Sequence, residues 1–219
     1  MKKRIKNNKS FFIFHLKDEI TNKIRKKFSY LKDDKFLKNK KWNFRKRSFA
    51  KGEVSNSKIL WSKDNSFFQS KKNNKYIGGI KRKFYPMSLV IKKSIEKIII
   101  NFINRDLISK KNVYLGAHAI RIVCNKNNLG YPVPEGFHHD GFDNVAIISV
   151  NKSSVSGGKS FLKNAKKKRI ELSKTLRINE VLFFDDKKFM HYASPIKLTK
   201  NKLGFRDIIV LTFHKKVYR

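Results

Sequence analysis

The chain has 219 residues, of which 40% are hydrophobic and 13% aromatic. This is enough apolar material to bury one core, so an intrinsically disordered chain is excluded and a single domain over residues 1–219 is expected. The single cysteine, Cys124, excludes an internal disulfide and favours a reducing, cytoplasmic location. The longest apolar run, IIINFI, is far shorter than the roughly 20 residues of a membrane-spanning helix, so no membrane partner is expected.

The net charge of the chain is +37, from 53 lysine and arginine residues against 16 aspartate and glutamate residues. Non-specific binding to polyanions at low salt is therefore expected. A selected nucleic-acid face is one explanation of this charge, but the basic residues are spread over most of the chain and 42 of them are lysine. Lysine is abundant together with asparagine, isoleucine and phenylalanine, whose codons are A/T-rich. Drifted codon usage is therefore the favoured explanation.

Helical periodicity is visible in two segments of the N-terminal half. Apolar residues recur every three or four positions over 15–31 and again over 88–107, which predicts two helices. Ser88 is a candidate N-cap of the second helix. The polar, Asn/Ser/Lys-rich passage at 51–75 predicts a loop that contains one short strand at most.

The C-terminal half is dominated by short runs rich in valine, isoleucine and phenylalanine, separated by Gly, Asn, Pro or Ser clusters. The strands predicted from these runs cover 114–124, 144–151, 159–164, 180–186 and 206–215. Several strands without intervening helices predict an antiparallel barrel or jelly roll, so a mainly β fold with N-terminal helices is expected. Gly157 and Gly158 are expected in a tight turn, and the charge-rich segment 163–174 is expected to be a solvated loop.

A His-X-Asp triplet, HHD at 138–140, is the first candidate for chemistry. Residues two apart on a strand point the same way, so His138 and Asp140 can bind one metal ion while His139 points to the other side. A third ligand has to come from a distant strand, and His191 follows the run EVLFFDD. Two imidazoles and one carboxylate on one face hold Fe(II) in many oxygen-activating enzymes and leave three positions for a chelating cosubstrate and dioxygen. These three residues are therefore the predicted metal ligands and catalytic residues.

Arg206 opens the last predicted strand, where a buried guanidinium needs an anion. The far carboxylate of 2-oxoglutarate would meet that need through a bidentate pair. The segment 131–150 contains no lysine or arginine, although about five would be expected at the average frequency of the chain. We interpret this window as kept free of positive charge for the metal, because cations beside Fe(II) would repel it. The competing interpretation is that His138 and His139 are solvated in a turn and that Arg206 lies on the surface.

These residues resemble the motifs of the 2-oxoglutarate/Fe(II) dioxygenase family that includes bacterial L-isoleucine 4-hydroxylase and other free amino acid hydroxylases. The resemblance extends from residue 78 to the C-terminus, and residues 1–77, a basic region of helix and loop, do not share it. The matching positions are 132–141 (P-x-P-E-G-x-H-x-D-G), 151–160 (N-x-x-x-x-x-G-G-x-S), Asp185 and Asp186 before His191, and Arg206 with Asp207. The resemblance implies a double-stranded β-helix, iron bound by the His138, Asp140 and His191 set, and 2-oxoglutarate held by Arg206.

Other residues have two possible roles each. His118 is expected either in the core or in the substrate pocket, and Arg121 either against a substrate carboxylate or in solvent. Asp185 and Asp186 are expected in a turn or beside His191, where they would help to orient its ring.

The function predicted from the sequence is an Fe(II)- and 2-oxoglutarate-dependent dioxygenase that hydroxylates a small molecule, expected to be a free L-amino acid, with release of succinate and CO2. One alternative keeps the iron chemistry but gives it a nucleic-acid base as substrate, in line with the charge of the chain. The other is a non-catalytic basic binding module on a degenerate β-helix scaffold. The intact ligand and arginine positions argue against the second alternative, because a scaffold without catalysis does not need all four.

Overall fold

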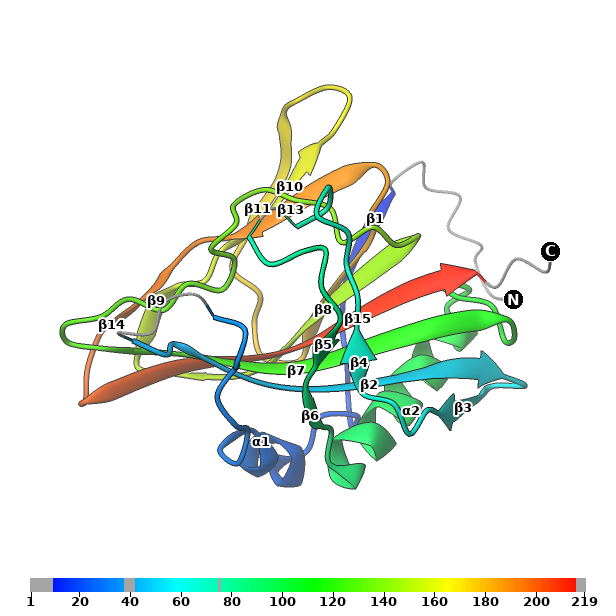
Figure 1. Cartoon of the computed structure of the whole chain (residues 1–219), viewed down its shortest axis with the longest axis horizontal. Coiled ribbons are helices and arrows are strands. Elements are labelled where there is room, and N and C mark those ends of the chain that lie inside the picture. The colour runs from blue at the N-terminus through cyan, green and yellow to red at the C-terminus, as the bar shows by residue number, and fades with distance from the viewer. Residues whose placement is uncertain (1–9, 38–41, 75, 216–219) are drawn as a thin grey trace.

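The computed structural model of the protein describes residues 10–37, 42–74 and 76–215, and its largest element is an eight-stranded sheet (Figure 1). Seven strands follow one another in the order β1–β12–β8–β15–β7–β2–β3, and β6 pairs with β2 outside this order. The neighbours are antiparallel, apart from the parallel pair of β2 and β6. The strands of this sheet are β1 Phe11–His15, β2 Arg45–Ser55, β3 Lys58–Trp61, β6 Tyr85–Pro86, β7 Val113–Asn125, β8 Asn144–Ser153, β12 Glu180–Asp185 and β15 Leu203–Lys215.

Shorter strands form further small sheets beside the main sheet. One has the order β11–β10–β13, and two are the pairs β9–β14 and β4–β5. Figure 1 shows the β10–β11 hairpin and β13 on the side of the main sheet opposite to the helices. The bounds of these strands are β4 Ser66–Phe67, β5 Arg82–Lys83, β9 Val155–Gly157, β10 Ser160–Asn164, β11 Ile170–Lys174, β13 Phe189–Ala193 and β14 Ile196–Leu198. The mainly β, double-stranded β-helix fold predicted from the sequence is confirmed.

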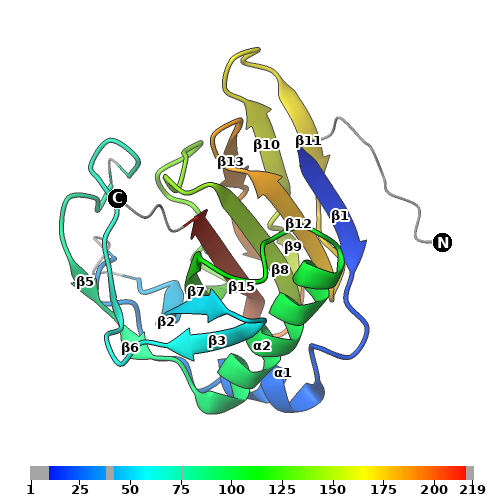
Figure 2. The same cartoon turned by 90° about the vertical axis from the view of Figure 1, so that its right-hand side faces the viewer.

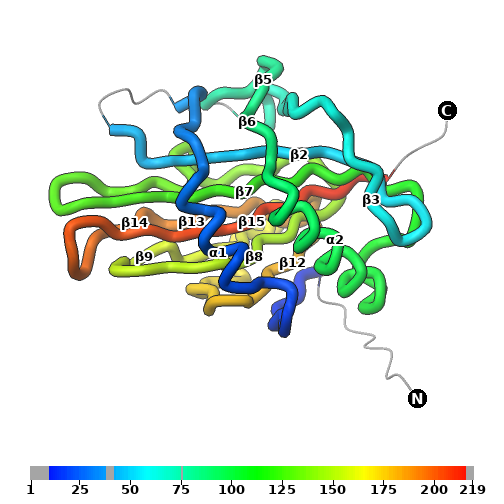
Figure 3. The backbone as a smooth tube through the Cα atoms, turned by 90° about the horizontal axis from the view of Figure 1, so that it is seen from below, coloured from blue at the N-terminus to red at the C-terminus, as the bar shows by residue number. Residues whose placement is uncertain are grey.

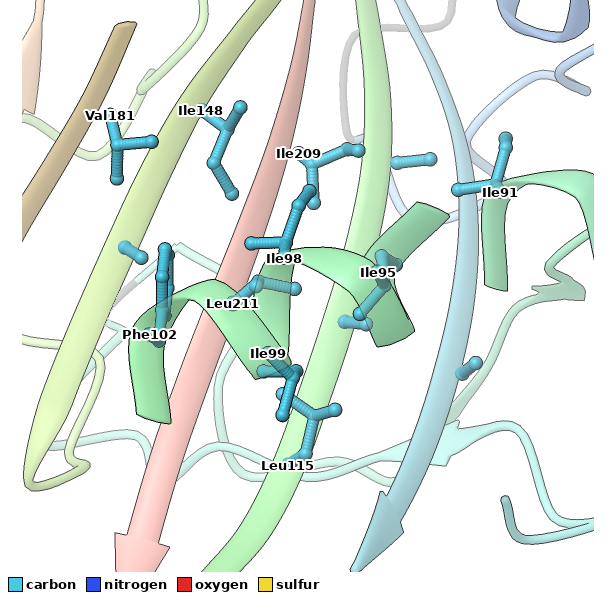
Figure 4. Packing of buried hydrophobic residues seen from close by; sticks show 14 of the residues in the cluster. Ile91, Ile95, Ile98, Ile99, Phe102, Leu115, Ile148, Val181, Ile209 and Leu211 are labelled. Atoms are coloured by element: carbon cyan, nitrogen blue, oxygen red, sulfur yellow. The ribbon is translucent and has the colours of Figure 1, made fainter. Parts of the chain in front are cut away.

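Two helices, α1 (Asn22–Phe28) and α2 (Leu89–Asn104), cover the outer face of the main sheet (Figures 2 and 3). The apolar stripe of α2 faces the strands, so that Ile95, Ile98 and Phe102 are fully buried. Figure 4 shows these side chains directed at residues of β15 and β7, among them Ile209 and Leu115. Burial of each such side chain stabilises the fold by roughly 1.5–3 kcal/mol relative to its exposure, so this stripe is a major part of the core.

The other face of the main sheet holds a second buried cluster, and the alternation of side chains along β15 separates the two. Ile209 and Leu211 belong to the helix-side cluster, whereas Ile208 packs in the inner cluster with Ile120 and Ile147. Residues of even number on β15 therefore point into the space between the sheets. Arg206 is one of them, which explains how a charged residue comes to lie inside the molecule.

The structure corrects several element predictions in the N-terminal half. The helix predicted over 15–31 is limited to α1, and the preceding segment contains the strand β1. The segment 51–75, predicted to be a loop with one short strand at most, contains the end of β2 and the whole of β3 and β4. The helix predicted over 88–107 is present as α2, with Ser88 at its N-cap. Its start was predictable because the cap adjoins a clear apolar stripe.

All five predicted C-terminal strands are present, and four further strands, β9, β11, β13 and β14, were not predicted. Segment 163–174 contains β11, so only part of it is a loop, and β13, which carries His191, was not predicted as a strand. Gly157 and Gly158 both have positive φ, and Gly157 is the last residue of β9. Within the described part of the chain, no helix is both long enough and apolar enough to cross a membrane.

Candidate metal centre and cosubstrate cavity

The His-X-Asp segment is fixed against β13 by an isolated antiparallel bridge between His138 and His191. The backbone N–H of His138 donates to the carbonyl of His191 at 3.2 Å, and the N–H of His191 donates to the carbonyl of His138 at 2.9 Å. Directly opposed residues on paired strands present their side chains to the same face. The two rings are accordingly close, with centroids 4.2 Å apart.

The side chains of His138, Asp140 and His191 converge on one point. One ligand atom from each residue lies within 4.8 Å of the other two. The Nε2 atom of His138 is 3.6 Å from Oδ1 of Asp140, and the Nε2 atom of His191 is 3.3 Å from Oδ2 of the same carboxylate. His139 lies outside this group, because its Nδ1 contacts the carbonyl oxygen of Asp186.

Contacts of the histidines leave their Nε2 atoms available to a metal. The Nδ1 of His138 lies 3.0 Å from the carbonyl oxygen of Gly136, so an N–H there donates and the lone pair is on Nε2. Nε2 of His191 is buried without a hydrogen-bond partner among the described residues. Burial opposes the charging of His138, but Asp140 and Glu135 outweigh it and raise the pKa of His138 to about 9. A cation is therefore strongly favoured at this point, whether it is a proton or a metal ion.

The Asp140 carboxylate is held ionised by its surroundings. Burial would raise its pKa, but His191 and His138 together hold the pKa of Asp140 well below its usual range. Gln69 donates from Nε2 to Oδ1 of Asp140 at 3.0 Å and to its backbone carbonyl at 3.2 Å. Gln69 therefore orients a metal ligand, a role that the sequence analysis did not predict because the local sequence does not indicate a contact with a segment 71 residues away.

Asp186 holds the segment that carries Asp140 in place. Its carboxylate accepts the backbone N–H groups of Asp140, Gly141 and Phe142 at 3.1, 2.7 and 3.0 Å. Among the described residues, His191 donates no hydrogen bond to this carboxylate, so the contacts of Asp186 orient the HxD segment instead of the distal histidine. Asp185 caps a turn by accepting the N–H groups of Lys187 and Lys188.

The three converging side chains line a cavity between the sheets, and Arg206 lies in its wall. Arg206 is 5% exposed, and both Nη atoms lack a hydrogen-bond partner in the described structure. Burial lowers its pKa to about 10, so the guanidinium remains cationic at neutral pH. A buried cation without a counterion is costly, which makes this a site for an anion. Ser160, whose hydroxyl is also unpartnered among these residues, lines the same cavity.

Gly158 makes room for the Arg206 side chain. A Cβ atom at this position would be 2.8 Å from Cδ of Arg206 and 3.1 Å from its Nε. Gly158 also has a φ of +64°, a conformation that favours glycine. The Gly-Gly pair therefore both turns the chain and shapes the anion site.

Three more arginines, Arg45, Arg47 and Arg82, line the cavity. The sequence analysis did not identify them, and they overturn its account of segment 131–150. The cavity as a whole is not free of positive charge, because four guanidinium groups from outside that window line it. The absence of cations from the window fits a simpler cause, since its second half is the buried strand β8.

His118 and Arg121 lie on the same strand, β7, but on opposite sides of the sheet. His118 lines the cavity, is stacked on Phe49 at a centroid distance of 4.4 Å, and accepts a hydrogen bond at Nδ1 from Nε of Arg47. Burial and the neighbouring Arg47 hold the pKa of His118 well below its usual value. Arg121 does not line the cavity and forms a bidentate ion pair with Asp207, with both N–O distances at 2.7 Å.

The donor set fits one kind of metal site. Two imidazoles and one carboxylate on one face, open on the side of the cavity, match the ligands of mononuclear non-haem Fe(II). A guanidinium with two free N–H edges in the same cavity fits a carboxylate of a cosubstrate that chelates the metal. The arrangement can therefore hold a metal ion and an anionic cosubstrate side by side.

Comparison with known proteins agrees with this chemistry. A family model described as 2OG-Fe dioxygenase matches residues 25–212. Similar solved structures include a bsmA homolog from Methylobium petroleophilum PM1, with a TM-score of 0.74, 24% identity, and 88% of this chain and 79% of that chain covered. IDO from Bacillus thuringiensis has a TM-score of 0.73 and 22% identity, with 95% of both chains covered. The Fe(II)/(alpha)ketoglutarate-dependent dioxygenase TqaL has a TM-score of 0.63 and 11% identity, with 96% and 84% covered. No curated protein matches the sequence significantly.

Proposed function

The chain belongs to the 2OG-Fe dioxygenase family, and from this premise we propose that it hydroxylates a free L-amino acid. Fe(II) is its metal and 2-oxoglutarate its cosubstrate, as the family match and the His-Asp-His triad together require. Bound iron and 2-oxoglutarate supply the oxidising chemistry, in which dioxygen is consumed, 2-oxoglutarate yields succinate and CO2, and one oxygen atom enters a C–H bond of the substrate.

The side chains of the cavity have separate tasks in this proposal. His138, Asp140 and His191 hold the metal on one face, and Gln69 keeps the Asp140 carboxylate turned toward it. Arg206 binds the carboxylate of 2-oxoglutarate that is remote from the metal. The observation that carries the proposal is the unpartnered, buried guanidinium of Arg206 in the same cavity as the triad.

A small substrate is supported by the form of the cavity. Polar and charged side chains make up most of its lining, with apolar residues from β4, β7, β8 and β15 between them. Buried polar groups need partners, which a small polar molecule would supply. An amino acid is supported by the resemblance of segments 132–141 and 151–160 to free amino acid hydroxylases. It is also supported by the presence of both arginine and glutamate side chains in the cavity wall.

The experiment that tests this function measures succinate formed from 2-oxoglutarate by the purified protein with Fe(II) and ascorbate. Each of the twenty proteinogenic L-amino acids is added separately. We expect one or a few of them to accelerate succinate release by at least about tenfold, and mass spectrometry to find a product heavier by one oxygen atom. The His191→Ala variant is the control and should lose this activity. If no amino acid accelerates succinate release by the wild-type protein, the proposed substrate class is wrong.

A further inference from the structure

We propose that one wall of the cavity recognises the two charged groups of a free α-amino acid. Arg82 and Arg45 bind the α-carboxylate, and Glu135 binds the α-ammonium group. This inference rests on the proposed function and adds to it the residues that distinguish an α-amino acid from other small acids.

Three buried guanidinium groups on one side of the cavity favour an anionic group in the substrate. Arg45, Arg47 and Arg82 are at most 9% exposed, and Asp34 is the carboxylate that pairs with two of them, at 2.8 Å from Nε of Arg45 and 3.9 Å from Nη1 of Arg47. Burial would raise the pKa of Asp34, but Arg45 and Arg47 lower it below its usual value, so Asp34 is ionised. Asp140 and Glu135 also act on these guanidinium groups, but among the described residues Asp34 is the one carboxylate in ion-pair contact with any of them, so a bound anion would supply the contact that Arg82 lacks.

Two of these arginines have donors that are free for a ligand. In the part of the chain that the structure describes, Nη2 of Arg45 and Nε of Arg82 are buried and have no hydrogen-bond partner. Arg47 is less available, because its Nε and Nη2 atoms are engaged with His118. Arg82 and Arg45 are therefore the arginines that can bind a carboxylate, and Arg47 completes the positive field around it.

This anion site is separate from that of Arg206. Arg206 on β15 and Arg45 on β2 are both paired with Ile122 of β7, so they lie in one row on either side of that strand. Two strand spacings separate their backbones by about 10 Å. The cavity therefore carries arginines from strands that are not neighbours, and we assign Arg206 to the cosubstrate and Arg45 with Arg82 to the substrate.

The cationic group of the substrate is matched by Glu135. This residue lines the cavity, and its Oε2 atom is buried and has no hydrogen-bond partner within the described ranges. Its other oxygen, Oε1, is 3.4 Å from Nδ2 of Asn74 and 3.9 Å from Nε2 of His138. A buried carboxylate oxygen without a donor needs a positively charged or N–H-bearing ligand, and an ammonium group supplies both.

A chain of hydrogen bonds connects the two halves of this wall. Nη2 of Arg82 donates to Oε1 of Gln69 at 3.3 Å, and Nδ2 of Asn74 donates both to that oxygen at 3.0 Å and to Glu135. Gln69 in turn donates to Asp140. The proposed carboxylate and ammonium sites are thus linked to each other by hydrogen bonds. Gln69 links both of them to the metal ligand Asp140.

The apolar residues that line the cavity indicate which kind of side chain the substrate has. Phe67, Ile77, Val133 and Val210 line the cavity and offer no charged group to a ligand. A side chain directed at these residues has to be apolar and of modest size. The substrate class is therefore a free α-amino acid with an aliphatic side chain, and a peptide is excluded because it has neither group free at an internal residue.

The test compares substrates that differ in one charged group. The amino acid that is most active in the panel is compared with the 2-hydroxy acid of the same carbon skeleton and with its own α-carboxamide. We expect wild-type protein to favour the amino acid over both analogues. Glu135→Gln should reduce kcat/KM for the amino acid by roughly 100-fold, yet leave that for the 2-hydroxy acid nearly unchanged. Arg82→Gln should reduce kcat/KM for the amino acid by a similar factor and remove the preference over the carboxamide.

Matched control variants and a second measurement distinguish loss of substrate recognition from loss of the fold. Glu171→Gln and Arg105→Gln change the same residue types away from the cavity, and their substrate preferences should equal those of wild type. The visible absorption band of the anaerobic complex with Fe(II) and 2-oxoglutarate reports on the metal and cosubstrate sites without any amino acid. We expect Glu135→Gln to retain the band.

The results distinguish failure of this inference from failure of the proposed function. If Glu135→Gln loses the band, or lowers turnover of the amino acid and of the 2-hydroxy acid equally, Glu135 does not recognise the ammonium group and the inference is wrong while the proposed function stands. Equal activity of the wild-type protein on the amino acid and the 2-hydroxy acid leads to the same conclusion. If no amino acid in the panel supports turnover, the proposed function itself fails.

Discussion

The segment that carries the metal ligand Asp140 is held in place by a neighbouring carboxylate. This carboxylate is that of Asp186, whose side chain accepts three successive N–H groups from residues 140–142 and so fixes the loop that carries Asp140. A hydrogen bond to a charged acceptor of this kind contributes about 1.5–3 kcal/mol. The position of a metal ligand therefore depends on a residue that does not touch the metal.

Asp186→Asn replaces one of these acceptor oxygens with an NH2 group that faces backbone donors. We expect the affinity for Fe(II) to fall about 10–100-fold, because groups that orient metal ligands have effects of this size. The measurement is an anaerobic titration with Fe(II) in the presence of 2-oxoglutarate. Asp185→Asn is the matched control, since Asp185 uses one oxygen, Oδ1, in an exposed turn and asparagine retains that oxygen. Equal losses in the two variants would contradict the role given to Asp186.

Gly158→Ala tests the proposed cosubstrate site without removing its charge. The new methyl group would press on the stem of Arg206 at 2.8 Å, so we expect the KM for 2-oxoglutarate to rise at least about tenfold. Gly79→Ala is the control, because Gly79 also has positive φ, at +86°, but its Cβ would meet an ordinary contact at 3.6 Å. Both variants then share the backbone strain, but only Gly158→Ala brings a methyl group against Arg206. An unchanged KM in Gly158→Ala would show that Arg206 does not hold 2-oxoglutarate.

At the scale of elements, α2 packs against one face of the main sheet and buries its side chains there. Ile98 on this helix is fully buried against the strands, whereas Ile100, two residues later, is 47% exposed. Ile98→Ala should lower the free energy of unfolding by about 2–5 kcal/mol, because it leaves a cavity under the sheet. Ile100→Ala should change it by no more than about 0.5 kcal/mol. Urea denaturation followed by circular dichroism measures both, and similar losses would mean that α2 is not the packed element described above.

The helix α2 and the long strands could be predicted because their signals are local. The apolar stripe of α2 and the β-branched runs of β7, β8 and β15 are visible within single windows of sequence. Strand β1 could not be recognised in this way, since Phe11–His15 pairs with β12 far along the chain and has no clear alternation of its own. The same tertiary effect limits α1 to Asn22–Phe28, although Leu16 and Ile20 are buried as helical periodicity suggested.

Some residues of the site could be predicted from the sequence, and others could not. The His-X-Asp triplet, His191 and Arg206 could be found because their types and order carry a motif. Gln69 and the arginines of β2 and β5 could not, since they meet only after distant segments fold together. Glu135 lies in the quoted motif at 132–141, but its place in the cavity was not predicted. One usable signal was overlooked: Arg45 and Arg47 alternate on one strand in a chain whose basic residues are mostly lysine. Arginine is preferred where a cation is buried and paired, so its choice over lysine points to such positions.

At the scale of the whole molecule, the charge of +37 has consequences of its own. We expect a labelled single-stranded oligonucleotide to bind with an affinity that falls steeply between low and physiological salt, because binding of this kind releases counterions. Fluorescence anisotropy measures this dependence. We also expect nucleic acid to leave the rate of succinate formation unchanged, since the cavity wall suits a small molecule. Acceleration of turnover by nucleic acid would instead favour a base as the substrate.

The position of β15 in the middle of the main sheet affects how the protein can be synthesised. Residues 203–215 pair with β8 on one side and β7 on the other, and no other strand pairing of the main sheet joins these two halves in the described structure. A nascent chain whose residues 203–215 are still inside the ribosome therefore exposes two open strand edges at once, and such edges promote aggregation. The main sheet can therefore be completed only after residues 203–215 have emerged, and until then its two halves stay unpaired.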